Sequence, residues 1–178
     1  MSVILSGCHG QSAEIQNKKF RKFTETLFCQ EVSSNAVSLH YTLKNPDQYG
    51  ITDSPVTFGY FSTDPGERKI TQAALKRFSY QKLSKQNQLT YDVLNYYLEL
   101  SKKESEYLLY EEPMGTVSGV QTQIPVLLSE YQFQTKTDVD AYLELMKTTP
   151  EYFNSLIAFE QEKAQKGLFM ANYIADTV

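Results

Sequence analysis

Apolar side chains recur at helical spacing along most of this chain. Between Thr90 and Glu112 one stripe carries Val93, Tyr97, Leu100 and Tyr107. Between Ser12 and Val32 a second stripe carries Phe20, Phe23 and Leu27. An amphipathic helix is stable only when its apolar stripe is buried against another element. We therefore predict an all-α fold, a multi-helix array that resembles a bundle.

Capping residues set the expected ends of the other helices. Asp64-Pro65, Thr137-Asp138 and Thr149-Pro150 each combine a residue that starts helices with a suitable first turn. Gly167 suits the position that follows a helix end, and Asn172 is expected to open one more turn. The predicted helices cover residues 12–32, 65–84, 90–112, 137–147 and 150–166. Residues 85–88 are expected to break the chain, so that helices 65–84 and 90–112 pack antiparallel.

Two stretches without helical spacing are predicted to be structured loops. The first, residues 33–68, contains Asn45-Pro46, Gly50 and Ser54-Pro55, and its segment 56–61 suits a short strand or an extended segment. The second, residues 111–125, contains Gly115 and Gly119, and a short apolar run follows it over residues 126–133.

Composition excludes several classes of function. The net charge of −4 is mixed along the 178 residues, without a basic block, so nucleic acid is not an expected partner. No apolar run reaches the roughly 18 residues of a spanning helix. His9 precedes Gly10 and His40 precedes Tyr41, and no paired Cys or His spacing typical of zinc sites occurs. We expect this chain to hold no cofactor, and His40 to be a hydrogen-bonded, partly buried histidine.

Four blocks of the sequence resemble, in order, the N-terminal part of the bacterial family known as domain of unknown function 885. They are SLHYTLKNPDQYGI (38–51), NQLTYDVLNYYL (87–98), PMGTVSGVQTQIPVLLSEYQF (113–133) and residues 138–170. The resemblance spans roughly residues 15–178. It implies a mostly helical protein, secreted or lipid-anchored, that is similar to zinc metallopeptidases of the gluzincin type.

The zinc motif of that family, a His-Glu pair followed closely by another His, is missing from this sequence. The resemblance therefore implies that residues 11–178 are the N-terminal helical portion of a larger domain, without the C-terminal portion that binds zinc. That portion and a peptide substrate are the expected partners, and the chain alone is not expected to be catalytic. The alternative is a stand-alone, non-enzymatic helical lipoprotein that binds a peptide or a surface protein. Carbohydrate binding through the tyrosines ranks third.

The N-terminus contains Leu5-Ser6-Gly7-Cys8, which resembles a bacterial lipobox. In a lipobox the cysteine carries the lipid, so Cys8 is the expected attachment site and the protein is expected at the bacterial cell surface, outside the cytoplasm. Residues 1–10 are then a signal remnant and tether. Residues 3–5 are shorter than the apolar core of an export signal, and an ordinary frayed N-terminus is the alternative.

Residues 119–125 are the expected substrate-facing loop. Gly119 allows close approach of a backbone, and the amides of Gln121 and Gln123 can pair with a peptide. In the alternative, the segment is a structural turn whose glutamines bind neighbouring carbonyls.

Glu160 is the fourth candidate for the substrate cleft. It lies near the apolar stripe that carries Ile157 and Ala164, where a carboxylate could border a cleft or brace another helix. In the alternative, it pairs with Lys163 or Lys166 at the boundary of the helix.

Overall fold

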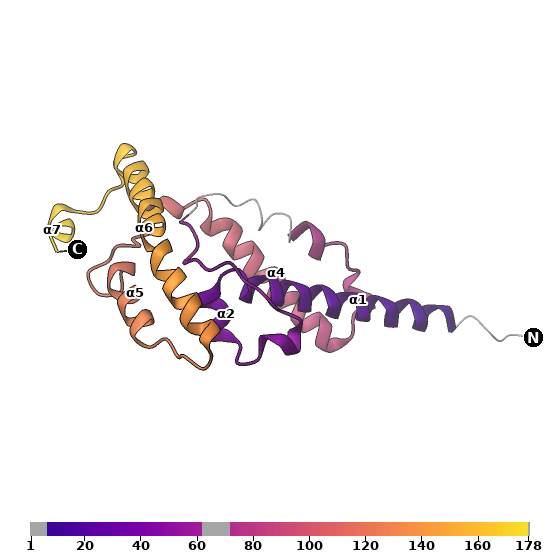
Figure 1. Cartoon of the computed structure of the whole chain (residues 1–178). Coiled ribbons are helices and arrows are strands. Elements are labelled where there is room, and N and C mark those ends of the chain that lie inside the picture. The colour runs from indigo at the N-terminus through magenta and orange to yellow at the C-terminus, as the bar shows by residue number, and fades with distance from the viewer. Residues whose placement is uncertain (1–6, 62–71, 178) are drawn as a thin grey trace, which may run out of the picture. The chain divides into compact units, whose positions relative to one another are not determined.

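The computed structural model describes residues 7–61 and 72–177, with side chains from Ser12 onward. These residues form helices and no strand, which confirms the all-α prediction. The α-helices are α1 (Gly7–Val32), α2 (Ala36–Thr42), α4 (Lys85–Glu104), α5 (Val120–Ser129), α6 (Lys136–Gln165) and α7 (Asn172–Ala175) (Figure 1). Single 3₁₀ turns are η1 (Pro46–Tyr49), η2 (Tyr80–Lys82) and η3 (Leu108–Tyr110). None of the helices in the described ranges is long and apolar enough to cross a membrane.

The chain divides into two compact units, which we describe separately. The first comprises residues 1–31 and 64–106, and the second comprises residues 32–63 and 107–178. The core of the first unit contains the buried side chains of Phe20, Leu75 and Leu83, with five more apolar side chains packed against them: Phe23, Phe78, Tyr91, Leu94 and Leu98. Helices α1 and α4 thus share one core, which contains Phe20 and Phe23 of the predicted stripe of α1. The stripe predicted for α4 was wrong, because Val93, Tyr97 and Leu100 are exposed.

Polar contacts set the direction in which α4 runs along α1. The Oδ1 of Asn17 accepts the backbone N–H of Ser84 at 2.7 Å and the Nδ2 of Asn87 at 2.7 Å. One turn further along both helices, the ring of Phe20 stacks on Tyr91 with centroids 6.2 Å apart. Contacts therefore advance along both helices together, so α1 and α4 run in the same direction.

The predicted break at residues 85–88 is wrong. Ser84 is extended and its hydroxyl accepts the backbone N–H of Asn87, so it caps a helix that begins at Lys85. The helix predicted over 65–84 does not reach Ser84, because the chain leaves the helix after Leu75 and forms η2 instead. Its predicted start at Asp64-Pro65 lies outside the described residues. Helix α4 ends at Glu104 rather than at residue 112.

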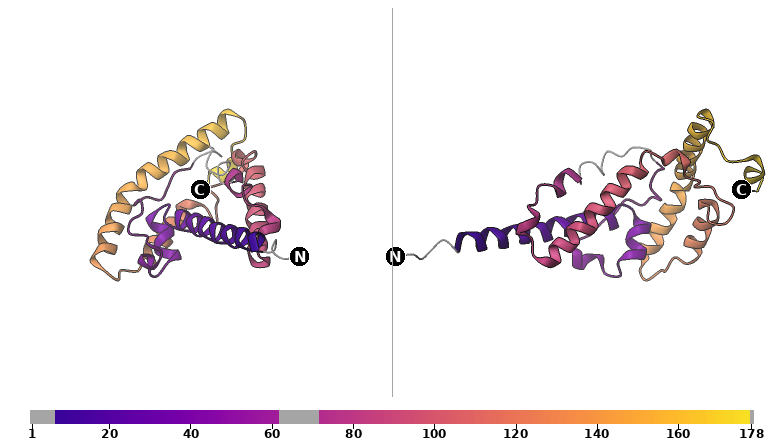
Figure 2. Two further views of the ribbon diagram at one scale, coloured as in Figure 1. Left: turned by 90° about the vertical axis from the view of Figure 1, so that its right-hand side faces the viewer. Right: turned by 180° about the vertical axis from the view of Figure 1, so that it is seen from behind.

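Helix α6 is a single helix of 30 residues where two were predicted. It begins with Thr135 as N-cap in a capping box with Asp138, two residues before the predicted Thr137. Pro150, the expected first turn of a separate helix, lies inside α6, which Figure 2 shows as one unbroken ribbon. Leu145 and Leu156 are buried on either side of Pro150, and this packing offsets the hydrogen bond that proline cannot donate.

The end of α6 confirms the prediction for Gly167. Its φ of 69° is the left-handed conformation that glycine adopts without strain. The N–H of Gly167 donates to the carbonyl of Ala164, and the N–H of Leu168 donates to the carbonyl of Lys163 at 2.9 Å. These bonds reverse the chain after α6. The turn expected at Asn172 forms as the short helix α7.

The first predicted loop contains local helix. Asn35 caps α2 by accepting the N–H of Ser38 at 2.8 Å, and Gly50 is the C-cap of η1. Residues 56–61 form neither the predicted strand nor a continuous extended segment, because the chain bends at Thr57 and Gly59 has a φ of 87°. They lie against α6, since the N–H of Phe61 donates to the hydroxyl of Ser155 at 3.1 Å. The hydroxyl of Tyr60 donates to the carboxylate of Glu151 at 2.7 Å.

Candidate functional site

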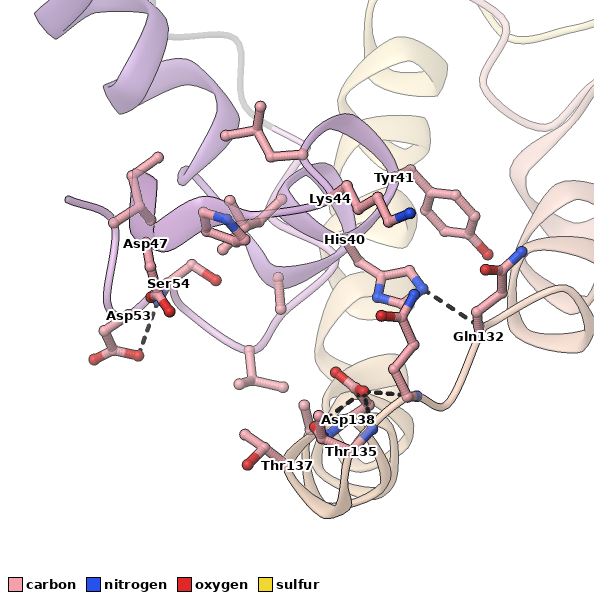
Figure 3. Close-up of a pocket in the computed structure, with 18 of the residues that line it drawn as sticks. His40, Tyr41, Lys44, Asp47, Asp53, Ser54, Gln132, Thr135, Thr137 and Asp138 are labelled. Carbon is pink, nitrogen blue, oxygen red and sulfur yellow. Dashed lines mark hydrogen bonds between the residues drawn. The ribbon is translucent and has the colours of Figure 1, made fainter. Parts of the chain in front are cut away.

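Two cavities lie along α6 in the second unit. The larger, of about 570 Å³, is lined by α2, the segment from η1 to Val56, and residues 131–141 (Figure 3). We call it the polar cavity because five charged or titratable side chains other than tyrosines line it: His40, Lys44, Asp47, Asp53 and Asp138. A cavity of this size with convergent polar groups is the usual starting point in a search for a binding site.

His40 is held from two sides in the polar cavity. Its Nε2 accepts the backbone N–H of Gln132 at 3.3 Å (Figure 3). Its ring stacks on Tyr131 with centroids 3.8 Å apart. The histidine is half-buried, which confirms the predicted hydrogen-bonded, partly buried role. Because Nε2 accepts, the neutral ring carries its proton on Nδ1.

Asp138 is the most fully bonded carboxylate of the polar cavity. Its Oδ2 accepts the N–H groups of Gln134 and Thr135, at 2.8 and 2.6 Å, and the Thr135 hydroxyl at 3.0 Å. Burial alone raises the pKa of Asp138, but these hydrogen bonds, helped by nearby His40, hold the pKa below its ordinary value. Its donors all come from the start of α6, so the carboxylate serves the helix terminus.

The second cavity, of about 360 Å³, is apolar. It lies between α6, Met114 and the segment that follows the chain reversal at Gly167. Its apolar lining consists of Met114, Phe153, Leu156, Ile157, Ala164, Phe169, Met170 and Ala175. Glu160 and Gln161 supply the polar side chains among the described residues that line it. The predicted cleft residue Glu160 thus borders a cavity.

Glu160 is an unusual lining residue because its carboxylate has no hydrogen-bond donor. Within the described part of the chain, both oxygens are shielded from solvent and neither accepts a hydrogen bond. The nearest cation, Lys163 Nζ, is 3.6 Å from Oε2, beyond hydrogen-bond length. Burial raises the pKa of Glu160, and the charge of Glu112 raises it further, while Lys163 opposes both.

Lys163 is fully buried and is bonded elsewhere. Its Nζ donates to the carbonyl of Glu111 at 2.6 Å and lies 2.9 Å from the carboxylate of Glu112. Lys166, the other partner considered for Glu160, pairs with Glu162 at 2.7 Å. Two carboxylates therefore share one ammonium group, and the cluster of Glu112, Glu160 and Lys163 carries one net negative charge when all three are ionised.

The predicted loop over residues 119–125 is wrong, because α5 begins at Val120 with Gly119 as its N-cap. A Cβ on Gly119 would overlap the backbone of Gly115, which approaches too closely for any side chain. This close approach replaces the expected loop with a tight turn that leads directly into the helix. Pro125 lies inside α5, and the helix continues past it because Ile124 is buried.

The two glutamines of this segment bind neighbouring carbonyls, as the alternative interpretation expected. The amide nitrogen of Gln121 donates to Gly115 O at 2.8 Å, and that of Gln123 donates to Ser118 O at 3.0 Å. None of Gly119, Gln121 and Gln123 lines either cavity. Their predicted contact with a substrate stays a prediction.

The remaining sequence candidates concern metal and lipid. In residues 7–61 and 72–177, no three His, Cys, Asp or Glu side chains are grouped as a metal site would require. Cys8 belongs to α1, and its side chain lies outside those described. No local sequence pattern indicated the polar cavity, since its lining residues come from segments about 90 residues apart, such as His40 and Gln132.

One comparison with known proteins finds a match. A family model described as bacterial protein of unknown function (DUF885) matches residues 63–178. The first block of the resemblance, residues 38–51, lies ahead of the matched range. No curated protein and no solved structure matches the chain.

Proposed function

Because the chain belongs to the bacterial family DUF885, we propose that it is the N-terminal helical portion of a metallopeptidase-like surface protein, in which it forms one wall of the substrate cleft. In this proposal the zinc and its ligands come from outside residues 1–178, since no His-Glu pair occurs among them. The chain binds a peptide and does not cleave it alone. A lipid on Cys8 anchors the protein at the bacterial cell surface.

The apolar cavity beside Glu160 is the observation that carries the proposal. Peptide side chains bind in concave, mostly apolar sites with a few polar groups that orient them, and this cavity has that composition. The polar cavity supports it less well, because Asp138 and His40 already have partners within the protein.

Methionine methyl NMR tests peptide binding at this cavity. Met114 and Met170 line it, whereas Met146 is exposed elsewhere on α6 and serves as an internal control. Addition of a tryptic digest of casein should shift the methyl signals of Met114 and Met170 and leave Met146 unchanged. Mass spectrometry should find the digest intact, with and without added zinc. Unchanged Met114 and Met170 signals, or zinc-dependent shortening of the peptides, would overturn the proposal.

The lipid anchor requires a separate test. With an export signal placed ahead of Met1, a bacterial host fed a palmitate analogue should label the protein, and Cys8→Ser should abolish the label. Cys29→Ser is the matched control and should keep it. Label that persists in Cys8→Ser excludes Cys8 as the attachment site.

One observation favours the alternative, a stand-alone binder of a surface protein. Helix α4 exposes an apolar face at helical spacing, made of Leu89, Val93, Tyr96, Tyr97 and Leu100. A partner that docks there should lose affinity on Val93→Asp, and that variant should leave peptide binding at the apolar cavity unchanged. A loss of peptide binding in Val93→Asp would instead place the peptide on α4.

A further inference from the structure

We propose that the apolar cavity is a specificity pocket for one large apolar side chain of a peptide, and that Glu112 selects a positively charged group beside that side chain. This inference rests on the proposed function, peptide binding by this wall of the cleft, and names the class of peptide. The occupant is therefore a large apolar residue, such as leucine, next to a lysine or arginine.

The lining of the cavity determines what enters it. Eight of the ten lining side chains are apolar, and the oxygens of Glu160 are shielded from solvent. A ligand that enters therefore meets carbon and sulfur atoms, and a polar side chain would lose its water without gaining a hydrogen bond. The volume of about 360 Å³ lies at the lower end of the range of about 300–1,000 Å³ typical of ligand pockets. This size accommodates one large apolar side chain together with neighbouring atoms of the peptide.

The charge beside the cavity determines what flanks the occupant. Glu112 lies two residues ahead of the lining residue Met114, and its side chain remains 46% exposed while it pairs with Lys163. Glu160 adds a second carboxylate close to the same ammonium. While Glu160 is ionised, the excess negative charge of this cluster attracts a cation and repels an anion.

The burial of Glu160 makes binding of an apolar occupant depend on pH. An apolar side chain in the cavity excludes water next to a carboxylate that already lacks a donor, which favours the protonated form further. Binding of the apolar residue should therefore tighten as the pH falls, and this dependence should vanish in Glu160→Gln. A direct hydrogen bond from the ligand to ionised Glu160 would give the opposite pH dependence.

Three blocked tetrapeptides measure the effect of the pocket and the effect of the charge separately. They are acetyl-Ala-Leu-Lys-Ala-amide, the same peptide with Ala in place of Leu, and the same peptide with Glu in place of Lys. The first should shift the Met114 and Met170 methyl signals most. Loss of Leu should weaken binding about tenfold or more, the effect typical of missing methylenes in an apolar pocket. Replacement of Lys by Glu should weaken it about two- to fivefold, an exposed-charge effect that salt reduces.

Variants of the full chain test which residues cause the preference for Leu and the preference for Lys. Ala164→Phe puts a phenyl ring into the cavity and should reduce the preference for Leu, whereas Ala158→Phe, also exposed on α6 but outside the cavity, should not. Glu112→Gln should remove the preference for Lys over Glu, and Glu144→Gln, which loses only its pair with Lys147, should keep it. An unchanged Met146 signal verifies that each variant is folded.

The outcomes distinguish this inference from the proposed function. If all three peptides shift Met114 and Met170 equally, the wall binds peptides and the proposed specificity is overturned. If none of them shifts these signals and the casein digest does not either, the proposed function fails. If the Lys-to-Glu change has no effect, Glu112 does not select the flanking residue.

Discussion

Asp138 and Glu160 are two carboxylates on the same helix, each beside a cavity, in opposite circumstances. Asp138 lies in the first turn of α6 and accepts three hydrogen bonds, so its pKa is lowered. Glu160 lies near the other end of α6, accepts none from the described residues, and has a raised pKa. The cause is the position along the helix: the N–H groups of Gln134 and Thr135, just ahead of α6, are available to Asp138, whereas the N–H groups around Glu160 are already used inside the helix.

This difference in hydrogen bonding favours a structural role for the polar cavity and a binding role for the apolar cavity. In the polar cavity, hydrogen bonds from residues 132–135 reach the Nε2 of His40 and the carboxylate of Asp138, and the groups hold the entry to α6 in place. At the apolar cavity, a buried carboxylate without a donor destabilises the protein, and such groups are rare in native structures. The apolar lining of the smaller cavity also remains open, which gives that cavity the stronger claim to a ligand.

The largest expected effect comes from Lys163→Ala. This change removes the cation beside Glu160 and leaves the carbonyl of Glu111 without its donor. Removal of one partner from a buried ion pair lowers the free energy of unfolding by about 3–5 kcal/mol. Because Glu112 is half-exposed, the loss for Lys163→Ala should lie near the lower figure. Urea denaturation of the full chain measures the loss. The double variant with Glu160→Gln should recover part of it, and no recovery would mean that Glu160 does not depend on Lys163.

Asp138→Ala should have the next largest effect, a loss of about 1–2 kcal/mol, because the capping box disappears. A lowered pKa gives stability that is present above the ordinary pKa of the carboxyl and is lost as the pH falls through the folded value. The difference between wild type and Asp138→Ala should therefore shrink in acid. Asp140→Ala, which loses only the exposed pair with Lys136, is the control and should cost little. An equal cost at Asp140 would contradict a special role for the capping box.

The sequence was sufficient where a local signal acted alone. The apolar stripe through Phe20 and Phe23 identified α1, and Gly167 marked the end of α6, since glycine at a positive φ depends on the backbone alone. Two prolines led to wrong predictions. Pro150 was expected to start a helix, but packing on both sides of it keeps α6 continuous. Pro125 was expected in a loop and lies inside α5, beside buried Ile124.

Part of the candidate site was predictable, because it depends on the spacing of residues within one helix. Helical spacing placed Glu160 near the stripe of Ile157 and Ala164, and all three residues line the apolar cavity. The other wall of that cavity depends on tertiary structure, because Met114 and Met170 approach α6 only after η3 and the Gly167 reversal position them. No sequence pattern within one helix could indicate that approach.

The smallest expected effect, and the one that compares the two carboxylates most directly, is that of Glu160→Gln. Because folding raises the pKa of Glu160, the native state binds more protons than the unfolded chain between the two pKa values. The free energy of unfolding of the wild type should therefore fall as the pH rises through that window, the reverse of the contribution from Asp138. Above it, Glu160→Gln should be more stable than the wild type by up to about 1 kcal/mol, because the amide loses less on burial than the carboxylate does, while Lys163 keeps Glu112. Urea denaturation at several pH values measures both slopes. If the stability of the wild type instead rises relative to that of Glu160→Gln as the pH rises, ionised Glu160 has a hydrogen-bond partner in solution. The carboxylate beside the apolar cavity would then not be unsatisfied.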